Sequence, residues 1–199
     1  MIVSHKYRFI FVKTRKTAGS SIEAALFPHL GPYDIITGSR RDGTPRLNCR
    51  DNITGHIGWR DLIKLVGQDT FFKYRKFTVE RNSYEKAASD WLYHKLILKD
   101  TNLDLCDYIN QIKPSDWTRY TMDNSPIFRI LRYETLTEEF NQFCQDYGLP
   151  SVPIQEYNVK KNDLRVLPYR EYYDINSINA VKGVFENEIR YFKYDYNLL

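Results

Sequence analysis

The sequence contains little cysteine, and its cysteines form no recognisable motif. Cys49, Cys106 and Cys144 stand too far apart for a zinc-ligand spacing, and they define no disulfide framework. The chain also lacks any apolar run near the ~20 residues that a membrane-spanning helix needs, and the apolar stretch near its start is too short for a signal peptide. We therefore expect reduced thiols, no membrane span and a cytoplasmic location.

A large excess of either charge is absent as well. The sequence has 29 Lys and Arg against 25 Asp and Glu, a net charge of +4, which is too mild to require bulk binding of nucleic acid. We expect no nucleic-acid partner, while local anion sites stay compatible with this charge. At 199 residues, the chain fits one globular domain over residues 1–199.

Strands and helices are expected to alternate along the chain. Strands are predicted at residues 8–12, 76–80 and 127–134. The predicted helices are the segment that ends at Pro28, residues 58–67, the segment from Tyr84, residues 135–149, and a last helix marked by Ile178, Val181, Phe185 and Phe192. Residues 28–55, rich in Gly, Pro, Asp and Arg, are predicted to be a long loop. The alternation predicts an α/β fold with a central parallel sheet flanked by helices, where ligands bind at the carboxyl ends of the strands.

The stretch FIFVKTRKTAGSSIEAAL, residues 9–26, passes from an apolar strand through a small, basic turn into a helix. Lys16 offers an ammonium group, residues 17–21 offer backbone N–H groups, and the start of the helix favours an anion. The Gly-Lys-Ser/Thr ending of a Walker A motif is absent. Two interpretations stay open here, a phosphate cradle and a simple capping box formed by Ser20 and Glu23.

A second polar group follows the next predicted strand. In FTVERNSYEKAASDW, Arg81 stands at the carboxyl end of the strand, and Ser89 stands about two turns into the following helix. Taken singly, Arg81 is typical of a surface ion pair and Ser89 of a solvated helical serine. Both are nevertheless expected near the edge of the sheet where the first turn lies.

Together, these motifs resemble those of the sulfotransferases that use 3′-phosphoadenosine 5′-phosphosulfate (PAPS), especially the bacterial and carbohydrate-type branch. RKTAGSS resembles the family's 5′-phosphosulfate loop, and RNSYEKAAS resembles its 3′-phosphate motif, with Ser83 and Lys86 as departures from that motif. The resemblance implies a P-loop-like sulfotransferase fold. It also implies a PAPS-binding set, namely Arg15, Lys16, Thr17, Ala18, Gly19, Ser20, Ser21, Arg81 and Ser89.

The same resemblance implies a reaction in which a sulfuryl group moves from PAPS to a hydroxyl of a saccharide acceptor, leaving 3′,5′-ADP (PAP) and using no metal. Lys16 would neutralise charge on the transferring group and on the leaving phosphate. His56 would be the base, with a structural role as its alternative and Glu80 as the next candidate. The resemblance further implies that Asn158, Lys160 and Lys161 close over the nucleotide or the acceptor. By their charge alone, Arg40, Arg41, Arg46 and Arg50 would attract an anionic acceptor, with ordinary solvated loop residues as the stronger alternative.

Two functions of other classes compete with this one. A kinase-like phosphotransferase would need Mg²⁺ and a carboxylate to hold it. A nucleotide- or nucleic-acid-binding module without catalysis would need clustered Lys and Arg and would show a strong salt dependence. The acceptor and the oligomeric state are not determined by the sequence.

Overall fold

The computed structural model describes residues 1–37, 49–50, 55–150, 152–154 and 167–198, which fall into two compact units. Met1–Glu80 and Thr118–Val159 form the first, which we call the sheet unit. Arg81–Trp117 and Lys160–Leu199 form the second, which we call the helical unit. Each unit has a hydrophobic core of its own, and the expectation of a single domain stays a prediction.

The sheet unit is built on a six-stranded sheet whose strands follow the order β4-β3-β1-β2-β5-β8. Its strands are β1 (Ile2–Ser4), β2 (Phe9–Phe11), β3 (Ile35–Thr37), β4 (Cys49–Arg50), β5 (Arg75–Glu80) and β8 (Arg129–Arg132). A separate two-stranded sheet consists of β6 (Thr121–Met122) and β7 (Ser125–Pro126). The predicted strands at 8–12, 76–80 and 127–134 are thereby confirmed.

The sheet is mixed, which corrects the expectation of a parallel sheet. β2 pairs in parallel with β5, and β5 with β8, but β1 runs antiparallel to both β2 and β3. β1 was not predicted, because a run of only three apolar residues is too short to show a periodicity. The α/β class with helices flanking a central sheet is confirmed.

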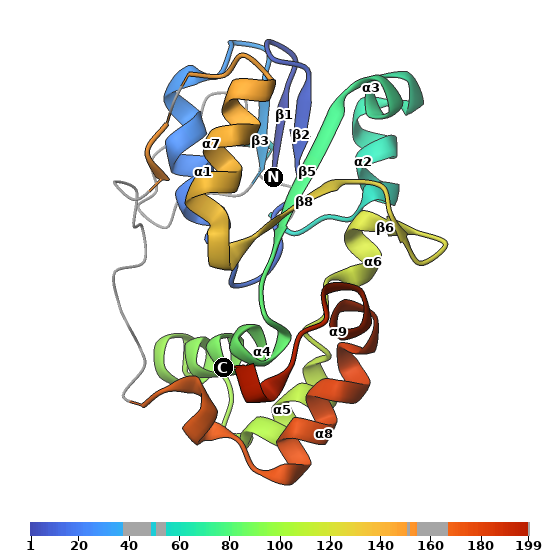
Figure 1. Ribbon diagram of the computed structural model, residues 1–199. Helices are drawn as coiled ribbons and strands as arrows, with labels where there is room; N and C mark the ends of the chain where they lie inside the picture. Colours follow the sequence, from blue (N-terminus) through green and yellow to red (C-terminus); the bar gives the residue numbers. More distant parts are fainter. Residues whose placement is uncertain (38–48, 51–54, 151, 155–166, 199) are drawn as a thin grey trace. The chain divides into compact units, whose positions relative to one another are not determined.

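One face of the sheet carries an aromatic core. The rings of Phe11 and Phe77 stack at 4.8 Å, and the Phe77 and Phe143 rings lie 4.1 Å apart. Phe143 belongs to α7 (Leu136–Asp146), which packs with α1 (Gly19–Leu26) on this face (Figure 1). Alternation along β2 and β5 sends Phe11 and Phe77 to the same side, as the two-residue period of a strand requires.

The helices of the sheet unit agree with the sequence prediction at most positions. α1 ends at Leu26 and is followed by a 3-10 turn, η1 (Phe27–His29), that contains Pro28. The other helical segments are α2 (Trp59–Val66), α3 (Gln68–Lys73), η3 (Tyr133–Thr135) and α7, while α6 (Trp117–Tyr120) begins at the boundary between the units. Gly148 follows α7 with a φ of 64°, a left-handed conformation that glycine adopts without steric cost.

The prediction of a long loop over residues 28–55 is partly wrong. β3 and β4 lie within that range and pair in parallel with each other. β3 contains two adjacent isoleucines, which suit a strand, but the many Gly, Pro and Arg residues around them mask this signal. Arg40, Arg41 and Arg46 lie outside the described residues.

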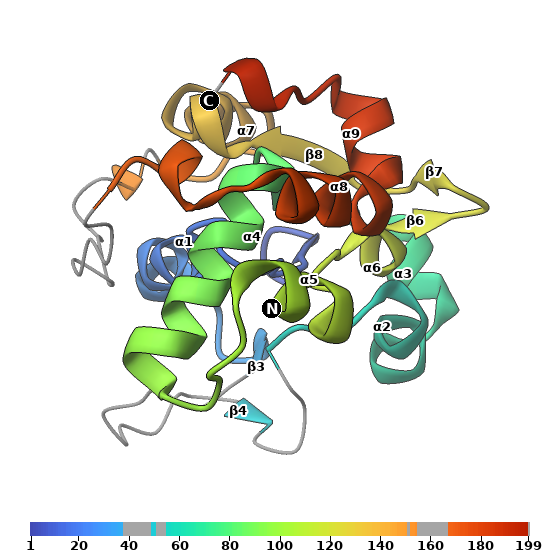
Figure 2. The ribbon, with the colours of Figure 1, turned by 90° about the horizontal axis from the view of Figure 1, so that it is seen from below.

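The helical unit consists of helices around a second core. It contains α4 (Ser83–Leu92), the π-helical η2 (Tyr93–Leu98), α5 (Leu105–Ile112), η5 (Tyr169–Tyr172), α8 (Ile175–Val184), α9 (Glu186–Phe192) and η6 (Tyr196–Leu198). Figure 2 shows α4, α5 and α8 side by side, and these three helices contact one another. The predicted helix from Tyr84 is confirmed, whereas the predicted last helix is in fact two, because α8 ends before Phe185.

Among the residues that the structure describes, no helix is both long enough and apolar enough to cross a membrane. The predicted absence of a membrane-spanning helix holds for those residues. The cytoplasmic location stays a prediction.

The aromatic core makes a first prediction about stability. Phe77→Ala removes a fully buried ring, and we expect the free energy of unfolding to fall by about 3–5 kcal/mol. Phe72→Ala removes a ring that is 62% exposed, and we expect a change within about 0.5 kcal/mol. Urea unfolding of both variants measures the difference, and similar losses in the two would contradict the packing described for Phe77.

Candidate functional site

The turn between β2 and α1 lies at the carboxyl edge of the parallel strands and is joined to β5 through hydrogen bonds. The Val12 N–H donates to the Phe77 carbonyl at 3.0 Å, and the Thr78 hydroxyl donates to the Val12 carbonyl at 2.8 Å. The hydroxyl of the buried Thr14 donates to the Val79 carbonyl. The start of the turn is therefore held against the neighbouring strand.

The backbone of the turn is left-handed at two positions, with φ values of 58° at Lys16 and 59° at Ala18. Residues other than glycine rarely adopt this backbone conformation. When left- and right-handed residues alternate, their successive N–H groups can point into one concave site. The N–H groups of Ser21 and Ile22 donate to the Ala18 carbonyl. Those of Gly19 and Ser20 precede the first intrahelical bond and remain directed out of the helix, as in any first turn.

Lys13 and Glu23 form the ionic centre of this edge. Glu23 is 3% exposed, and its carboxylate accepts from Lys13 Nζ at 2.8 Å and from the Met1 ammonium at 2.6 Å. Burial by itself raises the pKa of Glu23, but the two ammonium groups outweigh burial, so the pKa lies below its ordinary value. Lys13 Nζ also donates to the Ser20 hydroxyl at 3.0 Å.

The predicted capping box of Ser20 and Glu23 is wrong. The residue before α1 is Ala18, and no side chain caps this helix. Ser20 accepts from Lys13, and the Glu23 carboxylate is already bound to two cations. The local spacing suggested the box, but Glu23 binds the ammonium groups of Met1 and Lys13 instead.

Of the residues predicted to cradle an anion, the structure places Arg15, Lys16, Thr17 and Ala18 in the turn, and Gly19, Ser20 and Ser21 at the start of α1. Arg15 and Lys16 are partly exposed, and Thr17 is buried. The Thr17 hydroxyl lies 2.8 Å from the Thr14 hydroxyl, so it supports the turn from within.

His56 lies at the same edge. Its Nδ1 is 2.9 Å from the Lys13 carbonyl oxygen, and a carbonyl only accepts, so Nδ1 carries the proton and Nε2 holds the lone pair of the neutral ring. The His56 carbonyl accepts from the Arg119 guanidinium. Glu80, the alternative base, is fully buried and accepts from the Tyr120 hydroxyl at 2.9 Å.

Sequence reasoning missed four members of this edge, namely Met1, Lys13, Arg119 and Tyr120. Lys13 stands only three residues before Lys16, so its charge was visible, but its direction depends on Glu23 and could not be derived locally. Arg119 is 63 residues from its partner His56 in the sequence, and Tyr120 is 40 residues from its partner Glu80. No periodicity connects residues so far apart.

Arg81 and Ser89 belong to the helical unit. Arg81 is 6% exposed, and its guanidinium donates twice to the Glu85 carboxylate, at 2.6 and 3.0 Å, and lies over the Tyr169 ring. Ser89 is partly exposed within α4. The 3′-phosphate role predicted for both stays a prediction. Arg81 does form an ion pair, but the guanidinium is buried, so the pair is not the surface pair of the alternative interpretation.

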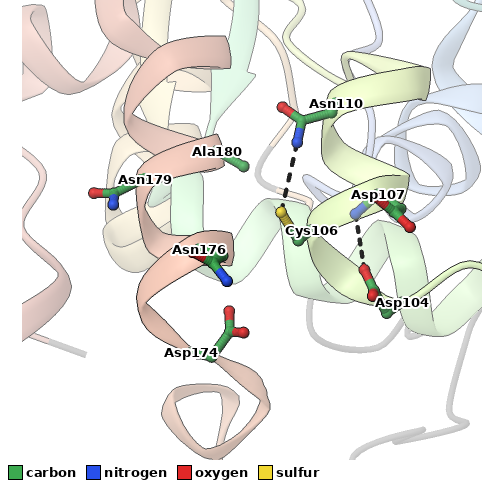
Figure 3. Close-up of a pocket in the computed structure, with 8 residues that line it drawn as sticks. All are labelled: Asp104, Cys106, Asp107, Asn110, Asp174, Asn176, Asn179 and Ala180. Carbon is green, nitrogen blue, oxygen red and sulfur yellow. Dashed lines mark hydrogen bonds between the residues drawn. The ribbon is translucent and has the colours of Figure 1, made fainter.

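The helical unit also contains a polar pocket of about 530 Å³ between α5 and α8 (Figure 3). Carboxylates and carboxamides line it, from Asp104, Asp107, Asp174, Asn110, Asn176 and Asn179. Asp104 and Asp174 cap the two helices through the N–H groups of Asp107 and Ser177. Burial and then the three carboxylates raise the pKa of the Cys106 thiol, so this thiol stays protonated at neutral pH.

Among the described residues, no group of three or more His, Cys, Asp and Glu side chains is placed to hold a metal ion. Asn158, Lys160 and Lys161 lie outside the described residues, and Arg50 is described only through the backbone of β4.

Comparison with known proteins gives two relatives. The chain is 28% identical over 134 residues to the mitochondrial exonuclease V of Debaryomyces hansenii, an alignment that covers 61% of this chain and 20% of that enzyme. It is 26% identical over 113 residues to an uncharacterized protein of Archaeoglobus fulgidus, and this alignment covers 53% of this chain and 91% of that protein. No family model matches the chain.

The exonuclease relative contradicts the expected function, because it connects the chain with an enzyme named for acting on nucleic acid and not with sulfuryl transfer. The predictions of a sulfotransferase and of carbohydrate sulfation are therefore wrong. No finding tests the site residues themselves, so the roles of Lys16 and His56 stay predictions that were made for that reaction. The resemblance itself and the binding of PAPS and PAP stay predictions from the motifs.

The contact between Lys13 and α1 makes a prediction about Gly19. A Cβ at this position would lie 2.5 Å from Lys13 Cγ, so Gly19→Ala must displace the lysine stem and we expect a loss of about 1–3 kcal/mol in unfolding free energy. Gly183→Ala, in α8, meets no atom within 4 Å and should be neutral or gain up to ~1 kcal/mol. Thermal or urea unfolding distinguishes them, and equal behaviour would refute the close approach.

The ion pairs of Glu23 predict a dependence of stability on pH. Because the folded pKa is below the unfolded value of about 4.3, the stabilisation is present above that value and is lost as the pH falls through the folded pKa. At neutral pH, Glu23→Gln should cost about 3–5 kcal/mol, since it leaves buried ammonium groups without a counter-charge.

The measurement is the free energy of unfolding of wild type and Glu23→Gln between neutral and acidic pH. The gap between the two proteins should shrink on acidification. Glu138→Gln is the control, because Glu138 is an exposed residue of α7, which packs on the same face of the sheet as α1. This change should alter the stability by no more than about 0.5 kcal/mol. A gap independent of pH would contradict the ionic role of Glu23.

Proposed function

We propose that this chain binds nucleic acid and that the turn between β2 and α1 holds one backbone phosphate. The observation that carries the proposal is the turn itself. It combines two left-handed residues, the first N–H groups of α1 and the partly exposed Arg15 and Lys16 at the carboxyl edge of parallel strands, and such a combination suits a phosphate group. The P-loop-like fold that the resemblance implied is likewise part of this proposal and concerns the same turn.

The distribution of charge supports the same ligand. Residues 1–80 contain fourteen lysines and arginines against seven aspartates and glutamates, although the whole chain carries only +4. The first eighty residues, which include the turn, therefore carry a net charge of +7, whereas residues 81–199 carry a net charge of −3. The mild overall charge concealed this asymmetry and led to the expectation that no nucleic acid is bound.

The likeness to exonuclease V favours nucleic acid over the phosphotransferase alternative. The chain spans 20% of the length of that enzyme, and the proposal is accordingly one of binding and assigns no reaction. The uncharacterized archaeal relative, which the alignment covers almost entirely, adds no ligand of its own.

Lys16→Gln tests the proposal. We expect the affinity for a fluorescently labelled oligonucleotide to fall by about 10- to 100-fold, because a charge-assisted contact contributes ~1.5–3 kcal/mol. Fluorescence anisotropy at fixed ionic strength measures this affinity. Calorimetry with a nucleoside 5′-monophosphate should likewise show weaker binding by Lys16→Gln than by wild type.

Lys64→Gln is the matched control, because Lys64 is 79% exposed on α2 and pairs with Asp61. This variant loses the same charge as Lys16→Gln, but we expect its affinity for the oligonucleotide to change by less than about twofold. Equal losses in both variants would mean that the sheet unit attracts anions without a defined site. Unchanged binding in Lys16→Gln would exclude the turn as the phosphate site.

A further inference from the structure

The edge of the sheet opposite the turn carries an arginine at the start of each parallel strand. Arg8 directly precedes β2, Arg75 is the first residue of β5, and Arg129 is the first residue of β8. The three strands are neighbours in the sheet, and the Arg75 N–H donates to the Arg8 carbonyl at 3.0 Å. We call these three residues the arginine row.

The row is exposed and only partly neutralised. Arg8 and Arg75 are exposed, and the side chain of Arg129 is 36% exposed. Arg129 pairs with the Asp146 carboxylate at 2.6 Å, while Arg75 donates to the Asp146 carbonyl at 3.3 Å and lies 4.4 Å from the centre of the Tyr147 ring. In these contacts, the carboxylate of Asp146 pairs with one of the three guanidinium groups, and its carbonyl accepts from a second.

A row of this kind suits the phosphates of a polymer. A guanidinium binds phosphate through two parallel hydrogen bonds, and one that rests on an aromatic ring, as Arg75 does on Tyr147, loses less freedom when it binds. Neighbouring strands lie about 5 Å apart. In the register, Arg75 lies opposite Phe9, next to Arg8, and Arg129 lies opposite Phe77, two residues beyond Arg75. The three guanidinium groups therefore follow a diagonal along this end of the sheet, where one chain of phosphates can contact several of them.

The distance between the two edges determines what size of ligand can contact both. β5 has six residues and rises about 3.3 Å per residue, so the row and the turn are separated by about 20 Å. Phosphates along one strand of a duplex advance about 3.4 Å each, so roughly six of them cover this length. A mononucleotide reaches only one edge.

We propose that the arginine row is a second contact surface for the nucleic-acid backbone, so that the ligand is a polynucleotide and not a mononucleotide. This inference rests on the proposed function, because it assumes that the turn holds a phosphate of the same ligand. It adds a site on the opposite edge of the same sheet.

The test compares the double variant Arg8→Gln/Arg75→Gln with wild type in binding a labelled single-stranded oligonucleotide of about twelve nucleotides and a mononucleotide. Oligonucleotide affinity should fall by at least about tenfold, and the slope of log Kd against log salt should fall by about two, one for each lost phosphate contact. Mononucleotide affinity should not change.

The matched control is Lys64→Gln/Arg190→Gln, which removes the same charge from helical side chains that are 79% and 66% exposed. Its slope of log Kd against log salt should differ from that of wild type by less than about half of the change expected for one phosphate contact. Arg8→Gln alone is the second variant, because Arg8 precedes β2 and lies outside the strand pairing; it should lower the slope by about one.

The outcomes separate the two proposals. A row variant that binds the oligonucleotide like wild type, or a control that loses as much, overturns the arginine row while the effect of Lys16→Gln can still support the turn. If Lys16→Gln changes the binding of neither ligand, the proposed function fails first. Loss of mononucleotide binding in the folded row variant also overturns the inference, because the two edges would then act on one phosphate.

Discussion

A buried carboxylate between two ammonium groups organises the edge of the sheet unit on which the proposed function depends. A carboxylate as buried as Glu23 is stable only when it is paired. Its pairing draws Lys13 across the start of α1, where only a glycine at position 19 leaves room for the lysine stem. The carbonyl of the same Lys13 then accepts from the His56 ring. One ionic requirement thus connects the turn, the helix and a distant segment.

The direction of β1 makes that arrangement possible. Because β1 runs antiparallel to β2, Ile2 lies opposite Phe11, at the end of β2 from which the turn departs. The Met1 ammonium is thereby brought to Glu23. A parallel first strand would place Met1 at the other end of the sheet, about one strand length away. The antiparallel pairing therefore affects the site as well as the fold.

The turn between β2 and α1 indicates the kind of ligand but not the reaction. A strand, a small basic turn and a helix indicate an anion, because dipoles and N–H groups meet there whatever the protein does. They do not identify the reaction, since many activities share such folds. The likeness to an exonuclease supports nucleic acid as the proposed ligand, and the turn suits a phosphate of nucleic acid or of PAPS alike. Opposite it, Arg75 and Arg129 converge on Asp146 and continue the basic character of the unit.

The sequence by itself determined the elements whose signal is local. The apolar runs before Lys13 and Arg81 predicted two central strands, and the stripe from Tyr84 to Leu92 predicted α4. The small and polar residues 15–21 predicted the turn between β2 and α1. Tertiary structure decided what depends on partners far along the chain. Glu23 met Met1 and Lys13 instead of capping its own helix, because buried charges pair with the strongest counter-charge that the fold brings within reach. Strand direction was decided in the same way, since pairing between strands is a non-local contact that three apolar residues cannot encode.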